Sequence, residues 1–261
     1  MPVVAITGAS AGIGRATALR LARDGWDVAI CARRAEPLEE AARAIRAAGG
    51  RVCAVRADVT APEDMRAFAD ATRRAFGAID AVVCNAGYGL YGAIDAVDAE
   101  AMRRMFDVNV FGTVHALQAM LPEMRARGRG HIVMVSSIVG RRGIPFMGPY
   151  SASKFAQTGL GECVRAELRD SGIHVTLVYP ISTETEFFDV MAAHSGFATR
   201  ASGPRQSAET VAAAIARALR HPVAEVYPYR PSRLLTIVNA LAPRLTDVIV
   251  RRWGRQPLPP S

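Results

Sequence analysis

A serine, a tyrosine and a lysine in the middle of the chain are spaced for acid–base chemistry. Ser137 closes a β-branched run, and Tyr150 and Lys154 lie four positions apart in a predicted helix, where such residues share a face. A free tyrosine titrates near ~10, and a cation about 4 Å away is worth ~4 kcal/mol at an effective dielectric near 20. That is about three pKa units, so Lys154 would bring the pKa of Tyr150 toward working pH while Ser137 holds a carbonyl oxygen beside the phenol.

The same residues also fit a structural role, with Tyr150 and Lys154 on the surface of an amphipathic helix and Ser137 as a turn or cap residue. The composition favours chemistry. Of the 32 basic residues, 31 are arginine, and Lys154 is the only lysine. Arginine supplies an equivalent surface charge but not a compact ammonium with three donors, so the exception at this position indicates a chemical role.

A glycine-rich turn near the N-terminus is placed to hold a phosphate. It contains Gly8, Ser10, Gly12, Ile13 and Gly14 and follows the first apolar run directly. Gly8 allows the chain to reverse, Gly12 lets a phosphate approach the backbone, and Gly14 lets helix and strand pack closely. Free N–H groups at the helix start attract the anion. Tight strand–helix turns also use glycine, but this placement predicts dinucleotide binding.

The end of the second apolar run predicts which dinucleotide is bound. An acidic residue there would accept the ribose hydroxyls of NAD and repel a 2′-phosphate. The sequence has Arg33 and Arg34 instead, and arginine pairs with phosphate through forked, charge-assisted hydrogen bonds. The alternative is that both side chains only cap a surface loop. We expect NADP(H) to be preferred over NAD(H).

Short apolar runs alternate with helical patterns along the whole chain. Strands are predicted at 2–7, 27–32, 51–56, 80–84, 130–136 and 173–179, with a weak one at 223–227. Helices are predicted at 12–24, 36–48, 62–76, 99–127, 149–170 and 208–220. Strands that are apolar throughout and separated by helices indicate a parallel sheet covered on both faces. The expected fold is therefore α/β, a doubly wound parallel sheet in a three-layer α/β/α domain.

The composition excludes several classes of protein. At 261 residues the chain suits one domain with a substantial core. A net charge of +8 raises nucleic acid as a partner, but the arginines are scattered and no Cys/His finger spacing occurs, so we expect neither nucleic-acid nor metal binding. The four cysteines lack CxxC spacing, and no apolar run reaches the ~18 residues of a membrane span, so we expect a cytoplasmic protein.

Five motifs carry a resemblance to a known family. They are Gly8-x3-Gly12-x-Gly14, Asn85-Ala86-Gly87, Asn109, Ser137 and Tyr150-x3-Lys154. In order and spacing they resemble the short-chain dehydrogenases/reductases, in the branch of single Rossmann domains of about this length. The resemblance covers residues 2–186 closely and the rest loosely. It implies seven parallel strands in the order 3-2-1-4-5-6-7, and a homodimer or homotetramer formed through the helices at 99–127 and 149–170.

The resemblance also implies a role for each site residue. Tyr150 would be the general acid in reduction and the base in oxidation, and Lys154 would lower its pKa and hold the nicotinamide ribose. Ser137 would orient the substrate oxygen, and Asn109 would anchor a water that links Lys154 to solvent. The remaining residues would contact the cofactor: Asp58 with Val59 at the adenine, Asn85 and Gly87 along the cofactor path, and Pro180 and Thr185 at the carboxamide.

The sequence departs from the family pattern at three positions. Cys84 replaces the first Asn of Asn-Asn-Ala-Gly, and we expect it to alter only packing at the strand end. Ile181 replaces the Gly of Pro-Gly and would reshape the pocket near the nicotinamide. Ala11 stands where many NADP-dependent members have a basic residue, so Arg33 would recognise the 2′-phosphate largely alone.

The segment after Thr185 resembles the family's variable substrate lid. It contains Phe187, Phe188 and Met191 and continues to Phe197; with Tyr91, Phe146 and Met147 it suggests an apolar pocket. We therefore expect an aliphatic or aromatic ketone or alcohol as substrate. The alternative is that these side chains only pack the lid against the core.

The C-terminal residues form a separate, amphipathic pattern. We expect residues 1–230 to form the catalytic domain, with the lid at about 185–207, and residues 231–261 to form an extension. Apolar residues recur at helical spacing on both sides of Pro243, flanked by arginines: Leu234, Leu235, Ile237, Val238, Leu241, Leu245, Val248, Ile249 and Trp253. Such a tail packs on protein, the simpler interpretation, or lies on a membrane surface.

Two functions from different classes fit these observations. The first is an NADP(H)-dependent oxidoreductase that moves a hydride between the nicotinamide and a carbonyl or alcohol carbon. The second is a cofactor-binding sensor or regulator that has the fold but no turnover. A sensor should lack part of the Ser/Tyr/Lys set, and this chain has all of it, so we expect an enzyme.

Overall fold

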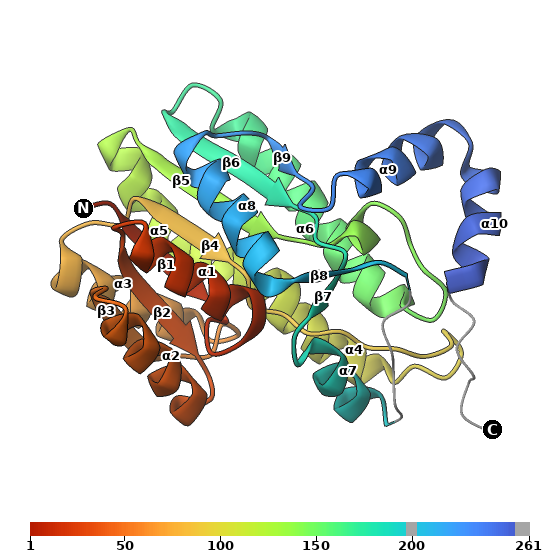
Figure 1. The fold of residues 1–261 in the computed structure, drawn as a ribbon, viewed down its shortest axis with the longest axis horizontal. Coiled ribbons are helices and arrows are strands. Elements are labelled where there is room, and N and C mark those ends of the chain that lie inside the picture. Colours follow the sequence, from red (N-terminus) through yellow and green to blue (C-terminus); the bar gives the residue numbers. More distant parts are fainter. Residues whose placement is uncertain (197–202, 254–261) are drawn as a thin grey trace.

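The computed structural model describes residues 1–196 and 203–253, and its centre is a seven-stranded parallel sheet (Figure 1). The strand order is β3-β2-β1-β4-β5-β6-β9, which confirms the expected topology, including the weak edge strand. The strands are β1 (Val3–Thr7), β2 (Asp27–Ala32), β3 (Val52–Arg56), β4 (Ala81–Cys84), β5 (Gly130–Val135), β6 (Ile173–Val178) and β9 (Glu225–Val226).

Helices cover both faces of the sheet, as the uninterrupted apolar runs predicted. Along β1, Val4 and Ile6 belong to one hydrophobic cluster and Ala5 belongs to the other, so both faces of the central strand are buried. The face of Val4 is covered by α1 (Gly12–Arg23), α2 (Ala35–Ala47) and α8 (Ala208–Arg220). The opposite face is covered by α3 (Pro62–Phe76), α5 (Gly112–Arg127) and α6 (Gly148–Glu167). These are the three expected layers.

The helix predicted at 99–127 is interrupted by one π-helical turn. It begins as α4 (Ala99–Phe106), where the Asp98 carboxylate accepts hydrogen bonds from two backbone N–H groups, and it continues as the turn η1 (Asp107–Phe111) before α5. The wider turn is closed by a hydrogen bond from the Gly112 N–H to the Asp107 carbonyl. Such turns are frequent at functional sites, and Asn109 lies in the middle of this one.

The segment after β6 forms a small subdomain at the end of the sheet. A short parallel pair joins β7 (Ser182–Glu184) to β8 (Arg205–Ser207), and α7 (Phe187–Ser195) lies between them in the chain. This part contains most of the predicted lid. Phe197, which the sequence included in the lid, lies outside the described residues.

The C-terminal extension consists of α9 (Pro231–Leu241) and α10 (Pro243–Trp253), which project beside the main domain (Figure 1). Its inner side is attached: Leu235 packs against the core, and Arg142 hydrogen-bonds Asn239 and pairs with Asp247. Residues 254–261 and the side chains of 252 and 253 lie outside the described part. No helix in the described ranges is both long and apolar enough to span a membrane. The outer side exposes five apolar side chains by 48 to 82%: Leu234, Ile237, Leu241, Leu245 and Val248.

The carboxyl ends of the parallel strands place the predicted chemical groups together. The glycine turn follows β1, Asn85 follows β4, and Ser137 follows β5 at the start of a short 3-10 turn, η2 (Ile138–Gly140). Pro180 comes two residues after β6. Ligands of open α/β sheets bind at this edge, where the strand order reverses.

Candidate active site

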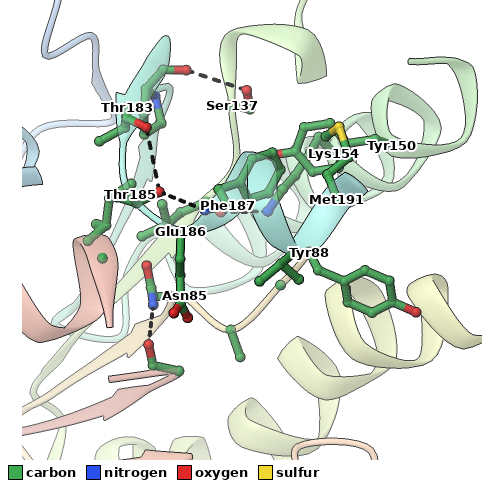
Figure 2. A pocket seen from close by; sticks show the side chains of 18 of the residues that line it. Asn85, Tyr88, Ser137, Tyr150, Lys154, Thr183, Thr185, Glu186, Phe187 and Met191 are labelled. Carbon is green, nitrogen blue, oxygen red and sulfur yellow. Dashed lines mark hydrogen bonds between the residues drawn. The ribbon is translucent and has the colours of Figure 1, made fainter. Parts of the chain in front are cut away.

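A cleft of about 400 Å³ lies at the carboxyl edge of the sheet (Figure 2). It extends from the glycine turn to the lid and includes the serine, tyrosine and lysine. Thirteen of the sixteen predicted site residues line it: Gly8, Ser10, Gly12, Ile13, Arg33, Val59, Asn85, Gly87, Ser137, Tyr150, Lys154, Pro180 and Thr185. The other three, Gly14, Asp58 and Asn109, are not part of this lining.

The glycine turn is a backbone cradle too narrow for side chains. Gly8 and Gly12 have positive φ angles of 66° and 54°. A Cβ on Gly14 would lie 2.4 Å from the Gly8 carbonyl oxygen, and one on Gly12 would lie 3.1 Å from Thr185. No side chain caps the start of α1, so its N–H groups remain for an anion. The cradle therefore fits a dinucleotide phosphate.

Asn85 fixes the position of the glycine turn. Its Nδ2 donates to the carbonyl oxygens of Thr7 and Gly8, both at 3.0 Å, and its backbone N–H donates to the Thr7 hydroxyl at 3.1 Å. Asn85 therefore ties the end of β4 to the end of β1. Its contribution to a cofactor site is the shape of the turn as well as the cleft surface.

The arginines after β2 differ in how firmly they are held. The Arg34 guanidinium pairs with Glu186 at the start of the lid. Arg33 is 60% exposed and lies 3.9 Å from an oxygen of Asp58, too far for a hydrogen bond. The other Asp58 oxygen accepts from Thr60 at 2.9 Å. Arg33 is thus the less constrained of the two cations that follow β2.

Ser137, Tyr150 and Lys154 meet in the inner part of the cleft. The Tyr150 side chain is buried, hydrogen-bonds Ser137, and has the ring of Phe187 5.2 Å away, centroid to centroid. Lys154 Nζ lies 5.7 Å from the centre of the Tyr150 ring. Figure 2 shows Tyr150 and Lys154 beside the lid residues Phe187 and Met191, across the cleft from Asn85. The expected spatial grouping is therefore present.

Burial controls the protonation of this group more than the lysine charge does. Burial raises the pKa of Tyr150, and the hydrogen bond with Ser137 opposes this only in part. Burial lowers the pKa of Lys154 to about 7. The predicted lowering of the Tyr150 pKa is wrong for this structure, because the pairwise charge argument omitted the desolvation of both groups. At neutral pH Tyr150 carries its proton.

Asn109 lies behind the cleft and joins three elements. Its Oδ1 accepts from the Tyr88 N–H at 3.0 Å, and its Nδ2 donates to the Tyr88 carbonyl and to Ser153 Oγ. Its own carbonyl accepts from Gln157 Nε2 at 2.6 Å, and Gln157 Oε1 accepts from Lys154 Nζ at 2.7 Å. Gln157 therefore links Lys154 to Asn109 through its carboxamide.

The outer part of the cleft is apolar. Tyr91, Met147 and the lid residues Phe187, Phe188 and Met191 line it, and Phe146 packs against Tyr91. Ile181 also lines it, and Cys84 is buried in the sheet. Among the residues that the sequence did not assign to the site are Tyr88 and Glu186, which line the cleft, and His194, whose ring stacks on Tyr88 at 4.4 Å.

Comparison with known proteins gives consistent matches. A family model described as short chain dehydrogenase matches residues 2–195. Human 17-beta-hydroxysteroid dehydrogenase type 1 is 40% identical over 194 residues, 72% of this chain and 58% of that protein. A short chain dehydrogenase/reductase from Burkholderia phymatum in complex with NAD has a TM-score of 0.85 at 28% identity, covering 99% and 98% of the chains. An alcohol dehydrogenase from Thermococcus sibiricus complexed with 5-hydroxy-NADP has a TM-score of 0.76 at 29% identity, covering 87% and 95%.

Proposed function

The chain belongs to the short-chain dehydrogenase family and is an oxidoreductase of CH–OH and C=O groups, and we propose that it interconverts an apolar ketone and its secondary alcohol with NADP(H), using Tyr150 as general acid and base. A nicotinamide dinucleotide is the cofactor of the class. The observation that carries the proposal is the meeting of Ser137, Tyr150 and Lys154 at the end of a glycine-lined cleft.

Each polar group of the inner cleft has a task in carbonyl reduction. Ser137 donates a hydrogen bond to the carbonyl oxygen and orients it toward the phenol. As the oxygen gains electron density, Tyr150 transfers its proton to it and becomes a phenolate. The buried ammonium of Lys154 stabilises that phenolate. The raised pKa of Tyr150 keeps the phenol in the donating form at neutral pH, which suits the reductive direction.

The chain provides a matching set of groups for the cofactor. Gly12, Ser10 and Ile13 would surround the diphosphate, Arg33 would pair with the 2′-phosphate, and Lys154 would hold the nicotinamide ribose. Asp58 and Val59 would contact the adenine, and Gly87, Pro180 and Thr185 would line the nicotinamide end. When bound, NADPH supplies the hydride. The absence of an acidic residue at the end of β2, where Ala32 precedes Arg33, supports NADP(H) over NAD(H).

The proposals for the substrate and for the assembly are supported by apolar side chains that line the cleft or are exposed on the surface. The aromatic lid and the similarity to a hydroxysteroid dehydrogenase support an apolar substrate. Phe111 and Phe155 are exposed by 52% and 45% on the helices expected to join subunits, which supports a homodimer or homotetramer. The four cysteines are free thiols, which supports a cytoplasmic location.

We also propose that the C-terminal extension, of which the structure describes residues 231–253, contacts an anionic membrane surface with its outer side. Its inner side already packs on the catalytic domain, residues 1–230. The exposed apolar side chains of α9 and α10 are flanked by exposed arginines, which attract acidic headgroups: Arg230, Arg233, Arg244 and Arg251. Peripheral contact of this kind would bring an apolar substrate to the cleft.

Replacing Tyr150 by Phe tests the acid–base assignment. We expect kcat for ketone reduction to fall at least ~100-fold, because the proton donor is lost, while NADPH still binds. The measurement is NADPH absorbance with a panel of ketones, with NADPH affinity determined by fluorescence. A Tyr150→Phe enzyme with near wild-type turnover would refute the assignment, and a wild type that binds NADPH but turns over no ketone or alcohol would favour a sensor.

Arg33→Ala tests cofactor choice. We expect the Kd for NADPH to rise about ten- to a hundredfold, because a charge-assisted pair with the 2′-phosphate is lost, and the Kd for NADH to change little. Arg43→Ala, at an exposed position of α2, is the matched control. Equal weakening of both cofactors, or of neither, contradicts recognition of the 2′-phosphate by Arg33.

Replacing Leu234, Ile237 and Leu241 together by Gln tests the membrane contact. We expect the wild type to sediment with phosphatidylglycerol-containing vesicles and not with pure phosphatidylcholine vesicles, and the triple variant to remain in the supernatant. Equal recovery of both proteins in the supernatant would end the membrane proposal. If light scattering shows that the triple variant has a lower molecular mass, the face belongs instead to a contact with a second copy.

A further inference from the structure

Gln157 contacts the ammonium of Lys154 on the side that faces the protein interior. It lies on α6 one turn after Lys154 and is fully buried. Its Oε1 accepts from Lys154 Nζ at 2.7 Å, and its Nε2 donates to the Asn109 carbonyl at 2.6 Å and to Thr113 Oγ1 at 2.9 Å. All three partners are themselves buried, so this is a closed polar network inside the protein.

The orientation of the carboxamide follows from the chemistry of its neighbours. An ammonium only donates hydrogen bonds, and a backbone carbonyl only accepts them. Oε1 must therefore face Lys154, and Nε2 must face Asn109, because the reversed amide would place donor against donor and acceptor against acceptor. The amide dipole thus has its negative end on the lysine.

Two oxygen atoms hold the ammonium in place. Lys154 Nζ donates to Gln157 Oε1 and to the Val135 carbonyl at 3.0 Å, at the end of β5. An ammonium has three donors, so one N–H is left for the cleft side. The titratable group that faces Lys154 among the described residues is Tyr150, and burial is the cause of the lowered lysine pKa.

We infer that Gln157 is a positioning residue for the oxidoreductase reaction, which holds the ammonium of Lys154 charged and aimed at the cleft by anchoring it to Asn109 and Thr113. The inference rests on the proposed function, in which that ammonium stabilises the phenolate of Tyr150. The inference adds a residue to the four predicted from sequence, Asn109, Ser137, Tyr150 and Lys154. None of these four accepts the hydrogen bond from the Lys154 ammonium that Gln157 Oε1 accepts. Gln157 touches no substrate and acts through Lys154.

Because Lys154 is the only lysine in the chain, its titration can be observed directly. Lysine labelled with nitrogen-15 at Nζ gives one side-chain signal, and its chemical shift against pH reports the charge of Lys154 without any substrate. We expect Gln157→Leu, which keeps the volume but removes the acceptor, to lower the titration midpoint by about one pH unit relative to the wild type. The sign follows because loss of a hydrogen bond to the charged form favours the neutral amine.

Two further variants separate positioning from simple packing. In Gln157→Leu the Asn109 carbonyl still accepts a hydrogen bond from the Thr113 hydroxyl at 3.0 Å, so the substitution does not leave this carbonyl without a donor. Gln157→Met is the substitute if thermal unfolding shows that the Leu variant is not folded, and it should shift the midpoint in the same direction. Thr113→Val is the control, since it removes one partner of the amide but leaves the contact with Lys154, and its midpoint should match the wild type.

The result that would overturn the inference is an unchanged midpoint in a folded Gln157→Leu or Gln157→Met protein. A shift of the same size in Thr113→Val would overturn it too, because the effect would then come from packing. Neither outcome depends on turnover. Failure of the catalytic assignment would appear only in the Tyr150→Phe kinetics, so the two are distinguishable.

Discussion

The ammonium of Lys154 is held almost entirely away from water, and the architecture around it follows from that constraint. A buried charge is costly unless hydrogen bonds replace its hydration. The end of β5 supplies the Val135 carbonyl, and α6 supplies Gln157. The π-helical turn η1 places the Asn109 carbonyl where Gln157 can be anchored. Three elements are therefore fixed relative to one another by the requirements of one cation.

The dinucleotide half of the cleft depends on close backbone approach. Gly14 packs against the Gly8 carbonyl, and Asn85 holds the same turn through three hydrogen bonds. Gly87 lines the cleft and also adjoins the network around Lys154, because a Cβ there would lie 2.9 Å from Asn109 Oδ1 and 3.5 Å from Lys154 Nζ. The glycine-lined part of the cleft and the hydrogen-bond network of Lys154 thus meet at Gly87, where there is no space for a side chain.

The parallel sheet could be predicted from the residues, because apolar runs mark buried parallel strands, whereas its strand order and many of the cleft residues were implied by the resemblance to the family. The protonation state of Tyr150 could not be predicted, because its pKa depends on burial, which the spacing of residues in the sequence does not reveal. The Arg34–Glu186 pair joins residues 152 positions apart and has no local signal. Gln157 did have a local sequence signal, because it is a polar residue three positions after Lys154 on the buried face of a helix.

In the proposed reaction, a compact, buried ammonium at position 154 supports proton transfer by Tyr150. Lys154→Arg keeps the charge but replaces the ammonium with a larger, planar group that cannot be held between Val135 and Gln157 in the same way. We expect the rate of ketone reduction by NADPH in this variant, measured at saturating cofactor with folding verified, to fall at least ~100-fold. A folded Lys154→Arg enzyme with a rate close to that of the wild type would contradict it.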